Sequence, residues 1–317
     1  MLPARVGHVS SAPVKCQGIK TKLVPFILGS LAWDEGRAGR WIEPFCGSCV
    51  VALNLAPQRA LLADSNRHII ELYRGIQSGA ITPAVVRAHL VEEGKRLARD
   101  GAAYYNRVRE RFNESGEPLD FLFLNRSCFN GLIRFNKDGA FNVPFGHKPL
   151  RFSSAYVSKV ANQVAWAAGR FAGRDWEFVV ADWQDTLHRA AAEDFVYADP
   201  PYVGRHADYF NGWTSEDAMK LAHAVGDLPC GYAVSMWLEN RYRRNEHVDR
   251  DWPGSEVRQW RHHYFIGSTE DLRNDMTEAL IIRRGYVAAT GDLAGRGRER
   301  RPESTQLRLS LTSGPDQ

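Results

Sequence analysis

Apolar and polar positions follow two different periods along the chain. Several short apolar runs are typical of buried strands, and the stretches between many of them carry apolar positions at helical spacing. This alternation predicts an α/β fold, with helices covering the faces of a sheet. The candidate strands cover residues 41–45, 60–63, 177–181, 195–198, 232–235 and 279–282.

Three of these runs are followed by an acid, namely Asp64, Asp182 and Asp199. Open α/β sheets bind ligands at the carboxyl ends of their strands, so these acids mark a candidate site. Asp199 begins the sequence "DPPY". Two consecutive prolines cannot continue a central strand because they lack the backbone N–H that the ladder needs, so this strand is expected to end near Ala198.

A long segment interrupts the pattern between the second and third candidate strands. It begins with an arginine-rich helical stretch and continues into a turn-rich, aromatic and basic block. The predicted organisation is a catalytic unit of residues 1–72 and 156–286, with residues 73–155 inserted as a mainly helical subdomain. Residues 287–317 have little core-forming material and a cluster of arginines, which is typical of a disordered basic tail.

Composition narrows the class of protein only moderately. The 317 residues are 44% hydrophobic and 25% charged, with a net charge of +4, values that are ordinary for a globular protein with a slight preference for polyanions. The sequence contains neither a membrane-length apolar stretch nor the apolar core of a signal peptide, so a cytoplasmic location is expected.

The five cysteines lack the spacing of a disulfide framework. Cys46 and Cys49, in "FCGSC", could form a dithiol redox centre, although the same small residues suit a strand-to-helix turn that approaches a nucleotide-type ligand. The remaining cysteines and the adjacent histidines 262 and 263 lack zinc-ligand spacing, and no metal is expected.

Six blocks in order carry a family resemblance: "KCQGIKTKLVPFI", "EPFCGSCVVALNL", "ADSNRHIIELY", "FLNRSCFNGLIRFNKDGAFNVPFG", "ADPPY" and "TEALIIR". This set resembles the Dam-like, D12 class of N6-adenine DNA methyltransferases over roughly residues 15 to 286. The resemblance implies a Rossmann-like, S-adenosylmethionine-dependent methyltransferase sheet in which the insertion recognises the DNA target. It implies methylation of adenine in a short double-stranded sequence, GATC or a related one.

The chemistry of "DPPY" follows from its residue types. The exocyclic amine of adenine is a poor nucleophile because its lone pair is delocalised into the ring. The Asp199 carboxylate and the Pro200 carbonyl could accept both amine hydrogens and so localise the lone pair, in a backbone preset by Pro200 and Pro201. Tyr202 offers a face on which a base extruded from the duplex can stack.

The glycine turn is expected to hold S-adenosylmethionine. Phe45, Gly47 and Ser48 would bring backbone close to the methionine part, and Asp64 suits the two ribose hydroxyls. By the resemblance, Asp182 would contact the adenine amine of the cofactor, unless it only caps a helix. Lys20 would contact the methionine end. In this interpretation Cys46 and Cys49 are small apolar fillers.

The inserted block supplies candidate DNA contacts. A guanidinium can pair with both guanine acceptors in the major groove, which makes Arg134 a candidate for base readout. By similarity, Phe129, Asn130 and Leu132 would lie at the target step, and Lys15 would contact a base. Further candidates at the end of the block are Pro144 and His147, the latter where many Dam-like enzymes carry arginine. Backbone or phosphate contacts are expected from Asn125, Arg126, Asn136 and Lys137.

Other functions remain open from the sequence alone. RNA adenine and the amide of a protein glutamine present the same lone-pair problem, and the latter class uses a similar Pro-Pro-Tyr turn, usually after Asn. A DNA-binding protein without activity and a dithiol oxidoreductase are alternatives from other classes. The sequence gives neither the recognition site, nor a preference for hemimethylated DNA, nor the oligomeric state. A cognate restriction endonuclease as partner is likewise left open.

Overall fold

The computed structural model describes residues 8–34, 39–202, 213–240, 244–263 and 275–289. Within them the chain forms a mixed sheet of seven strands with the order β3-β2-β1-β4-β5-β7-β6. β7 runs antiparallel to both of its neighbours, β5 and β6, and the other pairs are parallel. The strands are β1 (Trp41–Glu43), β2 (Arg59–Asp64), β3 (Asp175–Val180), β4 (Phe195–Ala198), β5 (Gly231–Asn240), β6 (Ser255–His263) and β7 (Asp275–Arg283).

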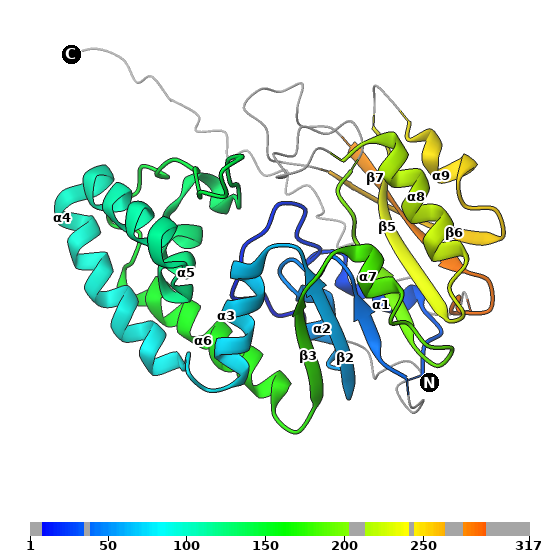
Figure 1. Ribbon diagram of the computed structural model, residues 1–317, viewed down its shortest axis with the longest axis horizontal. Helices are drawn as coiled ribbons and strands as arrows, with labels where there is room; N and C mark the ends of the chain where they lie inside the picture. Colours follow the sequence, from blue (N-terminus) through cyan, green and yellow to red (C-terminus); the bar gives the residue numbers. More distant parts are fainter. Residues whose placement is uncertain (1–7, 35–38, 203–212, 241–243, 264–274, 290–317) are drawn as a thin grey trace, which may run out of the picture.

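Helices flank this sheet, and a group of them extends to one side (Figure 1). The helices on the sheet are α1 (Val24–Ser30), α2 (Val50–Leu55), α3 (Arg67–Gln77), α7 (Trp183–Leu187), α8 (Ser215–Gly226) and α9 (Glu246–Arg250). The lateral group contains α4 (Pro83–Ser115), α5 (Pro118–Ser127), the 3-10 turn η1 (Phe129–Gly131) and α6 (Ser154–Phe171). Among the described helices, none has the length and apolar character needed to cross a membrane.

The core lies on both faces of the sheet because successive strand residues point to opposite sides. Trp41 and Phe195 pack into the cluster that includes α1, α2 and the lateral helices. Their neighbours Ile42 and Val196 pack into the second cluster, under α8. Both faces of β1 and β4 are therefore covered, and every residue of these short strands is buried, as expected for the centre of a mainly parallel sheet.

Local sequence signals set the limits of the lateral helices. The Thr82 hydroxyl accepts a hydrogen bond from the Val85 N–H, and Pro83 occupies the first turn of α4. α4 ends at Gly116 in a left-handed conformation, and Gly101, with φ of 55° and ψ of −127°, divides it into two helical segments. α6 then leads directly into β3, so the lateral group leaves and rejoins the sheet between neighbouring strands β2 and β3.

The predicted domain boundaries fall at different places relative to these elements. Residue 73, where the insertion was expected to begin, lies inside α3, and the Tyr73 hydroxyl donates to the Ser48 carbonyl near the sheet. At the other end of the chain, Val287 pairs with Leu31 in an isolated bridge, while the rest of the predicted tail, from residue 290, lies outside the described residues. The division into domains stays a prediction.

Candidate active site

The order of the sheet places the two main sequence blocks side by side. β1 lies between β2 and β4, with Trp41 paired to Phe195 and Ile42 paired to Val196. The chain therefore turns in opposite directions from these two strands, which is the switch point where open α/β sheets bind ligands. The glycine turn follows β1, and Asp199 follows β4 at the same edge.

The glycine turn is tied to the end of β2 through Asp64. One oxygen of the Asp64 carboxylate accepts from the Gly47 N–H at 2.9 Å, and the other accepts from the Asn66 N–H at 2.8 Å. Gly47 has φ of +47°, a left-handed conformation that favours glycine. Among the described residues, a Cβ at this position would have only the Cys16 sulfur within 4 Å, at 3.9 Å.

The two cysteines of this turn lack the properties of a redox centre. Cys46 is 5% exposed and Cys49 is fully buried. Burial raises the pKa of the Cys46 thiol well above its usual range and that of Cys49 to about 11, whereas reactive thiols need a lowered pKa and access to solvent. The structure therefore supports the interpretation of Cys46 and Cys49 as apolar fillers.

Glu43, which the sequence analysis did not single out, connects the two elements that flank the glycine turn. It is 3% exposed, and its Oε1 accepts from the Trp41 indole at 2.8 Å and from the Ala52 N–H of α2 at 2.9 Å. Burial raises the pKa of Glu43 to about 8, and both hydrogen bonds oppose this rise. Glu43 connects β1 to the first turns of α2 and so fixes the turn between them.

Asp199 stands at the exit of β4 beside a buried lysine. The Lys20 ammonium lies 2.7 Å from Asp199 Oδ1, and the lysine side chain is 5% exposed. Burial raises the pKa of Asp199, and the charge of Glu278 adds to the rise, whereas Lys20 opposes it. Lys20 was expected at the methionine end of the cofactor, and the sequence did not predict its contact with the candidate catalytic acid.

Tyr202 is held by a residue that the sequence analysis did not assign. Its hydroxyl donates to Glu278 Oε2 at 2.7 Å, and its ring lies 5.0 Å from the Lys20 ammonium. Glu278 belongs to β7 and is 6% exposed. Because β7 is antiparallel to β5, its first residues lie at the edge where β4 and β5 end, which brings Glu278 to the "DPPY" turn.

An aromatic group lies beside the glycine turn. The Phe45 ring is stacked with Trp183 at 6.4 Å and meets the edge of Trp213 at 5.7 Å. Asp182 precedes Trp183, is exposed, and accepts from the Gln184 N–H at 2.9 Å as the N-cap of α7. The structure thus shows the capping role of Asp182, while its contact with the cofactor stays a prediction.

The recognition candidates gather in the loop that follows α5. Phe129 is 49% exposed, and its N–H donates to the Pro144 carbonyl at 2.9 Å, so the two ends of the block meet. Asn130, with φ of 53°, and His147, with φ of 54°, are exposed on left-handed backbone. Leu132 is half-buried next to this loop.

Two cationic candidates have defined partners. The Arg134 Nε donates to Asn142 Oδ1 at 2.7 Å, which holds this half-buried guanidinium across the loop. Lys15 packs its side chain over Gly131, where a Cβ would lie 2.6 Å from Lys15 Cδ. Lys15 is therefore next to the turn that carries Phe129, although it is more than a hundred residues away in the sequence.

Asn125 and Arg126 do not fit the phosphate contacts expected of them. Asn125 is fully buried and Arg126 is 3% exposed, and their side chains bind the N-terminal segment instead. The Asn125 amide bonds both backbone groups of Lys15, and the Arg126 guanidinium donates to the Pro13 carbonyl and to Gln163. The expectation was wrong because the polar pattern of a buried helix face resembles that of an exposed one.

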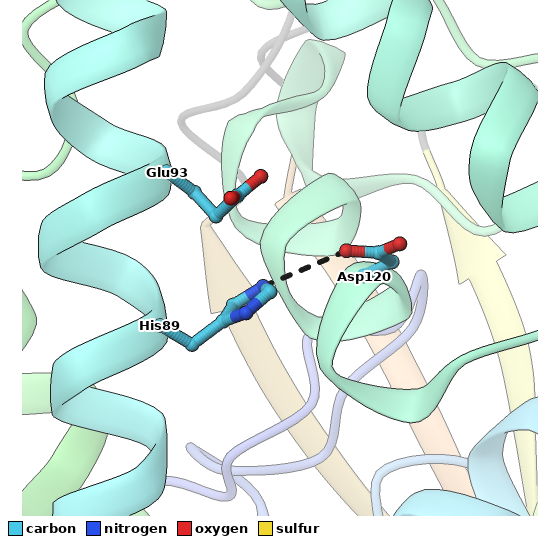
Figure 2. A group of neighbouring side chains, drawn as sticks. All are labelled: His89, Glu93 and Asp120. Carbon is cyan, nitrogen blue, oxygen red and sulfur yellow. Dashed lines mark ion pairs between the residues drawn. The ribbon is translucent and has the colours of Figure 1, made fainter.

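One group of potential metal ligands occurs in the described part of the chain, made of His89, Glu93 and Asp120 between α4 and α5 (Figure 2). The Arg111 guanidinium, however, donates to Asp120 at 2.5 and 2.6 Å and to Glu93 at 3.0 Å. Tyr104 also donates to Glu93, at 2.6 Å. These contacts describe a salt-bridge network that joins the two helices, with Arg111 as its cation.

The sheet order, the glycine turn tied to an acid and the "DPPY" exit together define an α/β methyltransferase dependent on S-adenosylmethionine. The family model for the D12 class of N6 adenine-specific DNA methyltransferases matches residues 17–264. The chain belongs to this family. It is a site-specific adenine DNA methyltransferase, and DNA is the substrate class of the family.

Individual relatives agree with this assignment. The chain is 33% identical over 224 residues to the DNA adenine methylase of Serratia marcescens, covering 67% of this chain and 76% of that protein. It is 36% identical over 194 residues to the retron Ec67 DNA adenine methylase of Escherichia coli, covering 59% of this chain and 63% of that protein.

More distant proteins are also similar. The Type II methyltransferase M.MjaIII of Methanocaldococcus jannaschii is 30% identical over 208 residues, which are 60% of this chain and 68% of that protein. The solved structure of the rRNA methyltransferase aviRa of Streptomyces viridochromogenes aligns over 89% of this chain and 90% of its own, with 13% identity and a TM-score of 0.36. This last similarity is too low to bear on fold or substrate.

Proposed function

We propose that the protein methylates N6 of an adenine extruded from double-stranded DNA, within a short site that is GATC or a related sequence. The observation that carries the proposal is the position of Asp199, at the switch point beside the glycine turn, with its Oδ1 bound by Lys20 and its side chain 23% exposed. In the described part of the chain, Asp199 Oδ2 has no hydrogen-bond partner. It is therefore available to a substrate amine.

The residues of the "DPPY" turn would prepare the amine for reaction. Asp199 Oδ2 and the Pro200 carbonyl accept its two hydrogens, which localises the nitrogen lone pair and stabilises the positive charge that develops on it. Pro200 and Pro201 preset the backbone that carries both acceptors. The Tyr202 ring, held through its hydroxyl by Glu278, gives the extruded base a fixed surface on which to stack.

The glycine turn would hold the cofactor beside this site. S-adenosylmethionine, when bound, would supply a methyl group that its positively charged sulfur activates toward the amine nitrogen. Phe45, Gly47 and Ser48 would contact its methionine part, Asp64 its ribose and Asp182 its adenine. The left-handed backbone of Gly47, with only Cys16 near a Cβ among the described residues, and the half-buried Asp64 carboxylate support this fit.

The loop after α5 would contact DNA around the extruded base. Phe129, Asn130 and Leu132 are proposed to lie at the target step, because Phe129 is a large apolar side chain that is 49% exposed in this loop. Arg134 and Lys15 are proposed to contact bases. Pro144 and His147 complete the proposed interface, and the pairing of Phe129 with Pro144 supports their grouping.

The test is to incubate the purified protein with S-adenosylmethionine and mixed-sequence duplex DNA, digest the DNA to nucleosides and identify methylated products by mass spectrometry. The expected product is N6-methyladenine, which Asp199→Ala should abolish while cofactor binding, measured by calorimetry, persists. Asp175→Ala is the matched control. Asp175 is an exposed acid at the start of β3, whereas Asp199 follows the end of β4. Near-normal turnover in Asp199→Ala would contradict the proposed chemistry, and a duplex left unmethylated by the wild-type protein would contradict the substrate.

A further inference from the structure

Hydrogen bonds of both the side chain and the backbone of Lys20 fix its contact with Asp199. The Lys20 ammonium lies 2.7 Å from Asp199 Oδ1 and donates to the Gly18 carbonyl at 2.9 Å. The Lys20 carbonyl accepts from the N–H groups of Leu23 and Val24 at 2.8 and 3.0 Å, where the chain enters α1. Both ends of the lysine are thus fixed.

Burial makes this ion pair different from an exposed one. The side chain of Lys20 is 5% exposed and that of Asp199 is 23% exposed. A buried ammonium is costly unless charged and polar partners surround it, so the pair cannot exchange freely with water. The remaining exposure of Asp199 leaves room for a second group to approach the carboxylate.

We propose that Lys20 is a positioning residue, which binds Asp199 Oδ1 and thereby keeps the carboxylate ionised with Oδ2 presented to the substrate amine. The inference rests on the proposed function of Asp199. It assigns the Lys20 ammonium to the catalytic acid rather than to the methionine end of the cofactor.

The charges around Asp199 explain why the site needs a cation. In the described part of the chain, Glu278 approaches it from β7 and Glu43 from β1. The hydroxyls of Tyr197 and Tyr202 and the Cys16 thiol are the further described titratable groups in electrostatic contact with it. Among these groups Lys20 is the cation. Without Lys20, burial and the charge of Glu278 would favour a proton on Asp199, and a protonated carboxyl accepts amine hydrogens less strongly.

The test compares Lys20→Met with Lys22→Met, since Lys22 is an exposed lysine two residues away. Single-turnover rates are measured between pH 5 and 9 on duplex DNA, and affinity for S-adenosylmethionine is measured by calorimetry. In Lys20→Met the acid limb of the pH–rate profile should move upward by about 1 to 3 pH units. The Kd for S-adenosylmethionine should change by less than about threefold. Loss of a direct contact worth about 1.4 kcal/mol of binding free energy would change it tenfold. Lys22→Met should change neither quantity.

A second set of variants keeps the test decisive if Lys20→Met folds poorly. Lys20→Arg retains the charge and should restore the position of the acid limb. In an Asp199→Asn background, Lys20→Met should have no further effect on the residual rate, because the lysine acts through that carboxylate. An unshifted acid limb, or a tenfold loss of cofactor affinity, would overturn the inference and leave methylation by the wild-type protein intact. A wild-type protein that methylates no DNA would remove the proposed function, and this inference with it.

Discussion

The side-chain amide of Asn125 binds both backbone groups of Lys15, with Nδ2 donating to the carbonyl at 2.8 Å and Oδ1 accepting from the N–H at 3.0 Å. Asn125 lies in the last turn of α5, and Lys15 begins the segment that leads to Lys20 beside Asp199. This amide therefore connects the loop that is proposed to contact DNA with the residue beside Asp199.

Asn125→Ala should lower the free energy of unfolding by about 1 to 3 kcal/mol, because it leaves buried backbone groups without partners. Asn113→Ala is the matched control, since Asn113 binds both backbone groups of Phe141 in the same way. Chemical denaturation measures the two losses. At comparable stability, kcat/KM for DNA methylation should fall further in Asn125→Ala, and equal activity in the two variants would argue against a role of Asn125 beyond folding.

Arg134→Ala should cost about 1 to 3 kcal/mol of discrimination at one guanine of the target site. The change removes the guanidinium that Asn142 now holds across the loop. Methylation rates on duplexes altered at single positions measure the effect. Lys137→Ala provides the comparison, because loss of an exposed phosphate-type contact should weaken all duplexes alike. A site preference unchanged by Arg134→Ala would exclude Arg134 from base readout.

Glu278→Leu should raise the barrier to methyl transfer by about 1 to 3 kcal/mol, because it deprives the Tyr202 hydroxyl of its acceptor. Tyr202→Phe should have an effect of similar size, and the double variant should be no worse than either single one. Ser235→Ala is the control, since it removes the partner of the nearby Tyr197 hydroxyl. Additive losses from Glu278→Leu and Tyr202→Phe would show that the two residues act independently.

Glu43 should make the stability of the protein fall as the pH rises from about 4.5 to about 8. The folded state binds a proton at Glu43 more tightly than the unfolded chain does, so the contribution is complete below the unfolded pKa and is lost through the folded one. Glu43→Gln should flatten this part of the curve of unfolding free energy against pH. A slope identical to that of the wild-type protein would mean that Glu43 is ionised in the folded state.

The sequence predicted the centre of the sheet more accurately than its far edge. The run 195–198 coincides with β4, and the other candidate runs lie within or overlap β1, β2, β3, β5 and β7. β6 was missed because its residues, "SEVRQWRHH", are polar or charged at most positions, and an edge strand needs only one neighbour. The lengths of β5 and β7 were underestimated for the same reason, since their polar ends continue the pairing.

For the site, the sequence identified residues in recognisable blocks and missed those that act through tertiary contacts. Asp199 and the glycine turn are adjacent at the switch point, as the acids at strand ends indicated. Nothing in the spacing of Glu278 or Glu43 indicates that they accept hydrogen bonds from Tyr202 and Trp41. Conversely, Arg126 stands in a polar-looking block, yet only the packing of the N-terminal segment against α5 shows that it is buried.

The strand order also determines when the active site can be completed as the chain leaves the ribosome. The glycine turn is synthesised before the lateral helices α4, α5 and α6, and the "DPPY" turn follows only after them. The glutamate that anchors Tyr202 comes later still, on β7, the last described strand to be synthesised. A nascent chain can thus carry every residue of the catalytic turn while lacking the contact that holds its tyrosine. Full activity therefore requires synthesis of the chain through β7.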